Sequence, residues 1–528
     1  MLLYLKPNVV LEPLFCSWYL WSCLIPPHVS AFFLKNRYLR IMRSFLQEPE
    51  VHLVASRNSK LSGGSFLALE SKHCDDIQRI VTYIEQSAGE LLQLADDIQY
   101  LDELLQLEAT GASLEPFYVQ IPERLKGCVE LIYDHNNQPG IRFFERILYE
   151  KYFKPELQSV LFSTLVNDNR QFVLSTPRIP TEQEMILPLS IDSKLLSMIC
   201  RSRTEGLVYE DLMAQLNLTE EQQRQFRDFF TEEIKCRKYS KVQQGVRLRY
   251  FGHACVLIES SECSILFDPL ISFMQPENGV ERYTLEDLPD FIDYVVFSHN
   301  HLDHIVFETL IFLKHKVGEF VFQTSSGNTK LNPSLAIMLQ HLGFLNIRSV
   351  DYLEAISLPN GLLYSYPFLG EHGDLDVQSK AGFYLCLAGQ KFFFAADSNN
   401  LDNALYEYLF QREGDIPTVF IGMECVGGPL DWIYGPLLSS KVKRSDKLSR
   451  RYSGSDASKA LQLAKTLNAR EVYVYAMGQE PWLSHITSFN YLEESPQLIE
   501  SNRFIELCKE NGIYSKRLFG KEEWTYGI

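Results

Sequence analysis

The sequence predicts an α/β protein in which a mixed α+β N-terminal domain precedes a layered α/β domain. Its 528 residues are enough for about two to four domains of ordinary size. From Gly245 onward, short β-prone runs alternate with helical stretches, as in strands interleaved with helices. Before that point, helical patterns are more prominent. We therefore expect domains at residues 1–244 and 245–528, with the boundary near residues 240–246.

The composition is that of an ordinary globular protein, with 46 % apolar and 22 % charged residues. The formal net charge of −17 argues against a nucleic-acid-binding function, because such proteins need a basic face. Eleven cysteines without a C-x-x-C pair fit a reducing compartment better than a disulfide framework. We therefore expect a cytoplasmic protein.

Residues 13–34 contain no Lys, Arg, Asp or Glu, and the stretch almost reaches the length of a membrane helix. Pro26 and Pro27 would break such a helix, however, and Glu12 does not suit the basic start of a signal peptide. A buried N-terminal segment explains the stretch better than a membrane or secretory role.

Residues 76–107 have apolar side chains at alternating spacings of three and four, which predicts one long amphipathic helix that ends before Gly111. The apolar seam of this helix can pack within its own domain or against a second subunit. Packing within the domain is the simpler interpretation.

Short helices are predicted at residues 193–201, 209–216 and 219–235, the last opening on a capping pattern at Thr219. This arrangement is compatible with a winged-helix-like module. Because the chain is acidic, we expect a structural role rather than DNA recognition.

The C-terminal domain begins with a change to short β-prone runs separated by turn residues. The predicted strands are residues 246–251, 255–259, 265–267, 294–297, 320–323, 382–387, 392–395, 418–421 and 471–475.

The sequence Ser298-His-Asn-His-Leu-Asp-His304 is the strongest functional signal. Three histidines in six residues are far more than the 12 histidines of the whole chain would produce by chance. The motif follows the predicted strand 294–297, and binding sites in α/β sheets favour the carboxyl edge of strands. Imidazoles two residues apart, followed by a carboxylate and a third imidazole, can supply two adjacent metal ions. The alternative is three surface histidines whose hydrogen bonds are already made and that bind no metal.

The C-terminal domain resembles the metallo-β-lactamase superfamily, which implies an αββα fold. The resemblance implies that Asp397 bridges two metal ions and that His485 is the last ligand; a lone buried histidine is the alternative for His485. The matching motifs, in order, are Gly252-His-Ala-Cys255, Ile265-Leu-Phe-Asp-Pro269, the His299–His304 motif, Gly370-Glu-His-Gly-Asp374, Ala395-Ala-Asp-Ser398 and His485.

Two neighbouring residues, Glu371 and His372, decide between two chemistries. With His372 as the ligand, the set has five histidines and two aspartates, which suits a hydrolytic dizinc site. With Glu371, it has four histidines and three carboxylates, a harder ligand set that suits iron and dioxygen. The spacing alone leaves both possibilities open.

The whole chain resembles the diiron β-hydroxylases of antibiotic biosynthesis. That family has an N-terminal dimerisation domain, and it hydroxylates the β-carbon of an amino acid held as a thioester on a carrier domain of a nonribosomal peptide synthetase. The resemblance thus implies a homodimeric monooxygenase. The matching segments are Tyr4-Leu-Lys-Pro-Asn8, Glu12-Pro13, Gly63-Gly64, Tyr133-Asp-His-Asn-Asn137 and Tyr475-Ala-Met-Gly-Gln-Glu-Pro-Trp482.

This resemblance favours Glu371 over His372 and implies two iron ions bridged by an oxo or hydroxo group, O2 as cosubstrate and an external electron donor. The alternative function is a dizinc hydrolase of thioesters or phosphoesters. The implied ligands are His299, His301 and Glu371 for one iron, Asp303, His304 and His485 for the other, and Asp397 as the bridge.

Other residues are candidates around this centre. Glu424 follows a predicted strand and is a candidate acid or amine-holding group, so Glu371 and Glu424 are the expected catalytic carboxylates. No Gly-rich dinucleotide motif is evident, so the reductant is expected to be separate. The candidate pocket residues are Met477, Gln479, Glu480 and Trp482.

Six of the eleven residues at positions 441–451 are basic, against one acidic residue. In an acidic chain this local reversal suits docking of an acidic carrier domain or the phosphate of its phosphopantetheine arm. A solvated loop is the alternative interpretation.

Overall fold

The computed structural model describes residues 2–527 except 59–60, 62–63, 234–238, 276–278, 441 and 489–490. All strands of its two large sheets lie at Val246 or later in the sequence. The domain boundary near residues 240–246 stays a prediction. Gly63, Cys236 and Lys441 lie outside the described residues, and the ten described cysteines carry free thiols.

The first large sheet has the order β15-β14-β13-β12-β11-β10-β23, and its strands β12 to β15 run parallel. Helix α10 (Phe307–Leu313) connects β13 to β14, and α11 (Leu335–His341) connects β14 to β15. The strand bounds are β10 Val246–Gly252, β11 Cys255–Glu259, β12 Ser264–Phe267, β13 Ile292–Phe297, β14 Val317–Gln323, β15 Ile347–Val350 and β23 Glu522–Tyr526.

The second large sheet has the order β16-β17-β18-β19-β20-β21-β22, and β19 to β22 run parallel. Helices α12 (Ala404–Glu413), α14 (Ala457–Thr466) and α16 (Pro496–Glu510) accompany its parallel strands. The strand bounds are β16 Ala355–Leu358, β17 Gly361–Tyr366, β18 Gly382–Leu387, β19 Gln390–Phe394, β20 Thr418–Gly422, β21 Glu471–Tyr475 and β22 Tyr514–Arg517.

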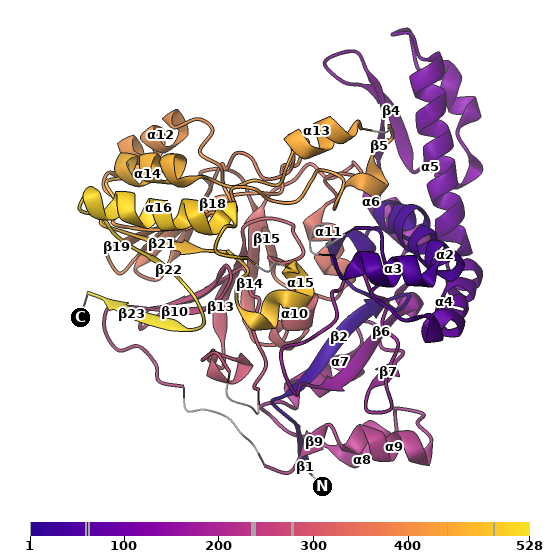
Figure 1. Ribbon diagram of the computed structural model, residues 1–528, viewed down its shortest axis with the longest axis horizontal. Coiled ribbons are helices and arrows are strands. Elements are labelled where there is room, and N and C mark those ends of the chain that lie inside the picture. The colour runs from indigo at the N-terminus through magenta and orange to yellow at the C-terminus, as the bar shows by residue number, and fades with distance from the viewer. Residues whose placement is uncertain are drawn as a thin grey trace.

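The two large sheets share one buried core between their inner faces. Phe267 on β12 stacks on Phe394 on β19 with ring centroids 4.0 Å apart, and Phe394 stacks on Phe420 on β20. Burial of this apolar surface holds the sheets face to face. The result is the predicted αββα arrangement, and each of the nine predicted strands is present (Figure 1).

The N-terminal domain is mixed α+β, as predicted. Its largest sheet has the order β3-β2-β6-β7, and a second sheet has the order β8-β1-β9. The strands are β1 Leu2–Leu5, β2 Val9–Phe15, β3 Trp18–Tyr19, β4 Val129–Tyr133, β5 Pro139–Phe143, β6 Gln158–Thr164, β7 Met185–Leu187, β8 Leu207–Val208 and β9 Phe230–Thr231.

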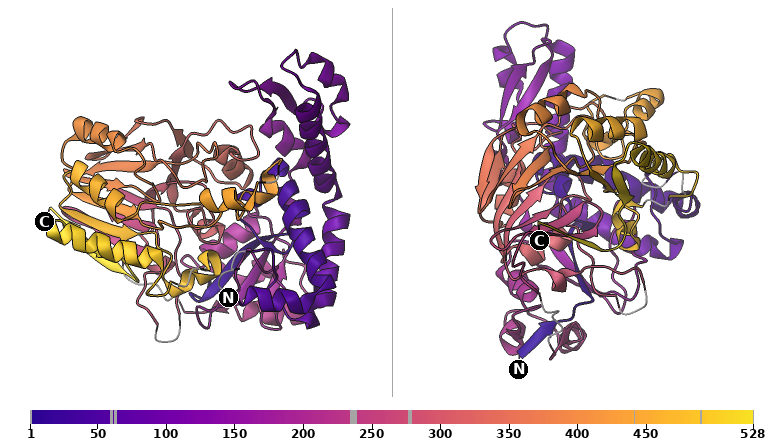
Figure 2. Two further views of the ribbon diagram at one scale, coloured as in Figure 1. Left: turned by 45° about the horizontal axis from the view of Figure 1, so that its top comes forward. Right: turned by 90° about the vertical axis from the view of Figure 1, so that its left-hand side faces the viewer.

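This domain covers the outer side of the first large sheet, because α10 packs against β2 and one hydrophobic core contains residues of both domains. Its helices stand on the side of the molecule opposite the C-terminus (Figures 1 and 2). They are α1 Pro27–Phe33, α2 Arg40–Gln47, α3 Pro49–Ser56, α4 Cys74–Ser87, α5 Gly89–Glu108, α6 Glu145–Tyr152, α7 Lys194–Arg201, α8 Tyr209–Met213 and α9 Glu220–Arg227.

The apolar stretch at residues 13–34 is buried, as expected, and forms parts of β2, β3 and α1. Pro27 lies in the first turn of α1, where a missing N–H costs nothing. Trp18 stacks on Tyr38 with ring centroids 4.0 Å apart. Among the described residues, no helix is long and apolar enough to cross a membrane.

The predicted long helix at residues 76–107 is wrong in one respect, because it is two helices, α4 and α5. The helical path breaks at Ala88, whose φ is −106° and ψ is 17°. Gly89 follows, and glycine lowers helix propensity by about 1 kcal/mol. The apolar seam packs within the domain, since α5 contacts α1 and α4 contacts α2.

The predicted helix at residues 219–235 is also wrong in length. Thr219 forms the expected capping box with Gln222, but α9 ends at Arg227. Phe230 and Thr231 form β9, which pairs with Leu5 and Tyr4 of β1. A distant strand thus takes residues that local periodicity assigned to a helix.

Candidate metal centre

The loop at residues 298–304 lies at the carboxyl edge of β13, next to the loop that follows β12. Ser298 donates its backbone N–H to Asp268 Oδ1 over 2.7 Å and its hydroxyl to Asp268 Oδ2 over 2.6 Å. Nδ1 of His304 lies 2.9 Å from the same Oδ2. Asp268 therefore orients His304 and leaves its Nε2 free for a ligand, as carboxylates do behind metal-binding histidines.

The second sheet supplies two carboxylates to the same place. Asp397 follows β19, and Glu371 lies in the loop after β17 with a φ of +68°. Gly422, at the end of β20, donates its N–H to Ala396 O over 2.8 Å. A Cβ at Gly422 would lie 2.5 Å from Asp397 Oδ1, so this approach requires glycine.

Seven side chains from the two sheets form three overlapping groups that can hold metal ions. In each group the three ligand atoms lie within 4.8 Å of one another, and most of the side chains are buried. Two groups share His299, and two share His304. The groups are His299, His301 and Glu371; His299, His304 and Asp397; and His253, Asp303 and His304.

Asp397 lies between the other two groups. Its Oδ2 is 3.0 Å from His304 Nε2 and 3.6 Å from His299 Nε2. On one side, Glu371 Oε1 is 3.1 Å from His301 Nδ1. The superfamily resemblance implies a bridging role for Asp397, and that role stays a prediction.

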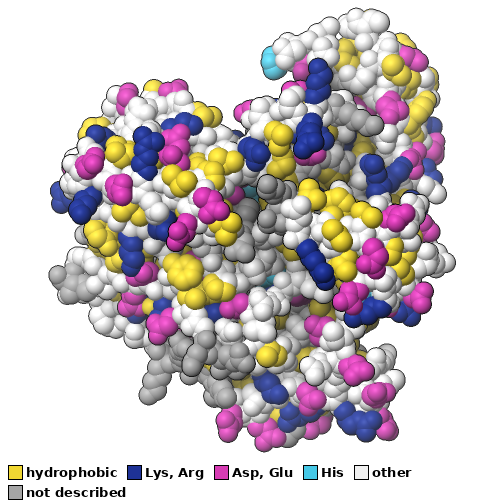
Figure 3. All heavy atoms as spheres, in the orientation of Figure 1, with side chains coloured by type: hydrophobic (Ala, Val, Ile, Leu, Met, Phe, Trp, Pro, Cys, Tyr) yellow, Lys and Arg dark blue, Asp and Glu magenta, His cyan; other side chains and the backbone are white. Residues whose placement is uncertain are grey.

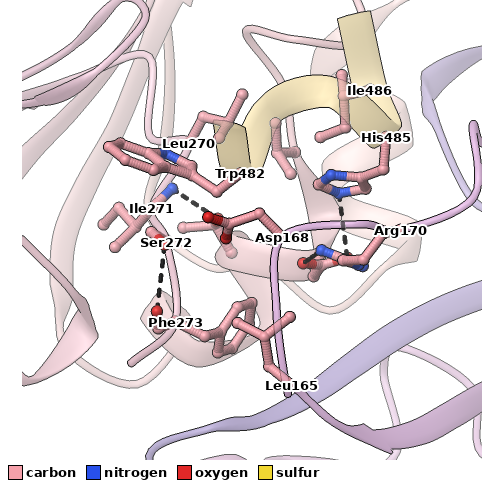
Figure 4. Close-up of a pocket in the computed structure, with 13 residues that line it drawn as sticks. Leu165, Asp168, Arg170, Leu270, Ile271, Ser272, Phe273, Trp482, His485 and Ile486 are labelled. Carbon is pink, nitrogen blue, oxygen red and sulfur yellow. Dashed lines mark hydrogen bonds and ion pairs between the residues drawn. The ribbon is translucent and has the colours of Figure 1, made fainter. Parts of the chain in front are cut away.

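His485 is not in any of these groups, although the family resemblance implied that it binds a metal ion together with Asp303 and His304. It lies on α15 (Ser484–Thr487), in a pocket with Arg170 and Trp482 (Figure 4). Its Nε2 is 4.0 Å from Glu308 Oε2. Val173 of the N-terminal domain donates its N–H to His485 O over 2.9 Å, so α15 is in contact with that domain.

His253, rather than His485, forms a candidate metal group with Asp303 and His304. It lies in the turn between β10 and β11, and its Nε2 is 3.2 Å from Asp303 Oδ2. Our sequence analysis did not assign a role to His253. The signal was present, because His253 belongs to the early Gly252-His-Ala-Cys255 motif of the superfamily resemblance.

Glu371 and His372 have different surroundings. Glu371 belongs to a candidate metal group, whereas His372 belongs to none among the described residues. The ring of His372 packs against that of His301, with centroids 4.5 Å apart and planes at 34°. Its two ring nitrogens have no hydrogen-bond partner among the described atoms.

Comparison with known proteins connects this geometry to a family. Residues 4–233 match the N-terminal domain of diiron non-heme β-hydroxylases, and residues 264–474 match the β-lactamase superfamily domain. The chain is 34 % identical over 522 residues to the 4-amino-L-phenylalanyl-[CmlP-peptidyl-carrier-protein] 3-hydroxylase of Streptomyces venezuelae, covering 97 % of this chain and 98 % of that protein. The chain belongs to the diiron non-heme β-hydroxylase family.

A solved structure agrees with this family, whereas a hydrolase matches only part of the chain. The crystal structure of CmlA, a diiron β-hydroxylase from Streptomyces venezuelae, has a TM-score of 0.93 and 32 % identity, and the match covers 100 % of both chains. A metal-dependent hydrolase of Brucella anthropi is 27 % identical over only 161 residues, or 26 % of this chain and 66 % of that protein. Membership thus favours a diiron hydroxylase over a dizinc hydrolase.

The donor set of this β-hydroxylase fits two cations. Burial raises the pKa of Glu371 and lowers that of His299, so burial disfavours the charged form of both side chains. Unpartnered buried polar atoms cost about 1–3 kcal/mol each, and imidazole and carboxylate donors suit iron or zinc. Among the residues of the three groups, the buried donor atoms without a hydrogen-bond partner are both ring nitrogens of His253, Nε2 of His301, Nε2 of His304 and Oδ1 of Asp397.

Glu424 of the hydroxylase lies beside these groups, after β20. Its Oε1 is buried and has no hydrogen-bond partner among the described residues. Burial raises the pKa of Glu424 well above its usual range, and the nearby carboxylates of Glu371 and Asp397 raise it further.

The other candidate pocket residues have different surroundings. Glu480 accepts a 2.6 Å hydrogen bond from the Tyr250 hydroxyl, and Met477 is buried in an apolar core. Arg282 lies over the ring of Trp482, 4.3 Å from its centroid. Trp482 lines the His485 pocket, and Gln479 is half-buried.

Proposed function

We propose that this enzyme hydroxylates the β-carbon of an amino acid held as a thioester on a carrier domain of a nonribosomal peptide synthetase. The reaction consumes one O2, two electrons and two protons, and it converts the C–H bond to C–OH with release of one water. The activity of the relative from Streptomyces venezuelae, a 3-hydroxylase of a carrier-bound amino acid, supports the substrate class. The observation that carries the proposal is Glu371 beside His301, which makes the donor set rich in carboxylates.

The proposed iron ligands are the residues of the three groups described above. When bound, the two irons supply activation of O2 with electrons from an external donor. Asp268 holds His304 in orientation through its 2.9 Å contact with Nδ1. One iron is assigned to His299, His301 and Glu371, the other to His253, Asp303 and His304, and Asp397 is shared.

Glu424 is assigned to the substrate. Its unpartnered Oε1 is suited to accept a hydrogen bond from the α-amino group of the tethered amino acid. Nearby, Tyr452 and Tyr434 pack against His301 and His372, with ring centroids 5.8 Å and 6.3 Å apart. These rings exclude water from the Glu371 side of the centre.

The test begins with protein purified without added metal. We expect two irons per chain, and a mass increase of one oxygen atom on the carrier-bound amino acid when O2 and a reductant are supplied. Glu371→Ala is expected to abolish hydroxylation, whereas His372→Ala retains it. Thioester cleavage without O2, with the opposite ranking of the variants, would show a dizinc hydrolase instead.

Assembly and location belong to the same proposal. The family resemblance supports a homodimer, and the N-terminal domain exposes Leu107 at 84 % and Val119 at 85 %. Light scattering is expected to give twice the chain mass. The ten described free cysteines are compatible with a cytoplasmic enzyme.

A further inference from the structure

The segment between β20 and α14, residues 423–456 without residue 441, forms a cap over the Glu371 side of the metal centre. On its inner side, Tyr452 packs against His301. Arg450 donates from Nε to Gly373 O over 2.8 Å, two residues after Glu371. The cap is therefore in direct contact with the loop that carries Glu371.

The outer side of the cap carries helix α13 (Arg444–Ser449). Lys447 is paired with Asp431 at 2.6 Å, and Arg451 donates from Nη1 to Gly427 O over 2.7 Å. Lys443 and Arg444 are exposed, and among the described residues neither has a carboxylate within ion-pair distance. Two unneutralised cations thus remain on this face.

Helix α13 lies beside the hollow between the two halves of the face that Figure 3 shows. Figure 3 shows Lys and Arg side chains at the rim of this hollow, over the position that Figure 1 labels α13. Leu448, 44 % exposed, follows Arg444 by one helical turn and so adds an apolar group to the same face.

The charge of this face contrasts with that of the chain, whose formal net charge is −17. A local positive field in an acidic protein attracts an anionic partner, whereas the negatively charged remainder of the surface repels that partner. Lysine and arginine are the side chains that proteins use to bind phosphate. Six residues of α13 span about 9 Å, so the cations lie within a short helix length of Arg450 and the Glu371 loop.

We propose that the outer face of α13 docks the carrier domain, with Lys443 and Arg444 binding the phosphodiester of its phosphopantetheine arm and Leu448 packing beside the arm. This inference rests on the proposed function, because it assumes a carrier-tethered substrate. The phosphodiester carries a negative charge in every carrier of this kind, whatever amino acid is attached. The surface therefore recognises the tether rather than the side chain.

The experiment compares the double variant Lys443→Glu/Arg444→Glu with the wild type on three thioesters of the same amino acid. They are the carrier-bound form, the free aminoacyl-phosphopantetheine and the phosphate-free aminoacyl-pantetheine. We expect the KM of both phosphate-containing substrates to rise about fivefold relative to that of the phosphate-free one. The KM of the phosphate-containing substrates is expected to rise with salt concentration in the wild type. In the double variant it is expected to rise much less.

Two controls separate docking from other effects. Lys509→Glu/Arg470→Glu makes the same charge change at exposed positions, with Arg470 at the amino end of β21, and is expected to leave the KM ratio unchanged. Lys443→Arg/Arg444→Lys keeps the charge and is expected to keep the wild-type ratio. Iron content, measured in parallel, is expected to stay at two per chain in each variant.

An unchanged KM ratio in the double variant would overturn the inference. A rise for the carrier-bound substrate alone would also overturn it, since the cations would then contact the carrier surface and not the phosphodiester. Failure of the wild type to hydroxylate the carrier-bound substrate would instead contradict the proposed function itself.

Discussion

The two ends of the metal centre are supported in different ways. The Glu371 end is covered by the 423–456 cap, a segment of the C-terminal domain itself. The end with His253, Asp303 and His304 is backed by the N-terminal domain, through residues 165–173. There Arg170 makes two hydrogen bonds to Glu308 on α10, of 2.8 and 2.6 Å.

Further contacts fix this second end. Asp168 accepts two hydrogen bonds from Arg282, of 2.7 and 2.8 Å. Arg170 also donates to Glu12 over 2.6 Å, and Glu12 accepts from Arg178 over 2.5 Å. All these groups are largely buried.

Because its residues support one end of the metal centre, the N-terminal domain is a structural part of that centre. Helix α10 begins at Phe307, three residues after His304, so an ion pair that holds Glu308 also holds the ligand loop. By contrast, the cap keeps exposed cations on its outer face. The N-terminal domain therefore supports one end through buried ion pairs, whereas the other end lies under a cap whose outer face is charged.

The largest effect is expected where the two ends meet. Asp397→Ala removes the shared carboxylate, so iron content should fall from two per chain toward none and hydroxylation should be lost. Elemental analysis measures this directly. Asp376→Ala, at an exposed aspartate, is the matched control. Retention of two irons by the Asp397 variant would show that the ends bind metal independently.

The next largest effect is a loss of iron from the end of the centre that contains His253, Asp303 and His304. His253→Ala is expected to lower the iron content from two per chain to one, because His253 lies beside Asp303 and His304. His485→Ala, which changes another buried histidine outside the groups, is expected to keep two. Loss of iron in the His485 variant alone would restore the ligand assignment that the sequence suggested.

A third change tests the support from the N-terminal domain. Arg170→Ala leaves Glu12 and Glu308 without their shared partner, and breaking a buried ion pair costs about 3–5 kcal/mol. Urea unfolding should show this loss. Iron content should fall by less than in the His253 variant. Arg40→Ala, on an exposed part of α2, should change neither the free energy of unfolding nor the iron content. Wild-type values of both quantities for Arg170→Ala would contradict the role proposed for Arg170.

The smallest effect is a pH dependence of the same network. Although burial opposes ionisation, Arg178 and Arg170 lower the pKa of Glu12 from 4.5 to about 2. The ionised form is therefore more stable folded than unfolded, and this contribution is lost as the pH falls from about 4.5 toward 2. Glu12→Gln should unfold more easily at pH 7 and lose less stability on acidification. A parallel loss in both proteins would contradict the assignment.

The sequence predicts the parts of the site that depend on local order. The 298–304 loop follows a strand that its apolar pattern identifies, and Asp397 likewise follows a predicted strand. The surroundings of His485 include a long-range contact, the hydrogen bond from Val173 N–H to His485 O. No local pattern encodes where the N-terminal domain anchors α15, and the same limit explains the strand at residues 230–231.

The central claim concerns Glu371, and iron-edge anomalous diffraction from crystals of the iron-loaded enzyme tests it most directly. The account predicts two iron peaks, with a Glu371 carboxylate oxygen bound to one of them and the His372 ring unbound. A His372 nitrogen bound to the metal, with the Glu371 side chain turned away, would contradict it.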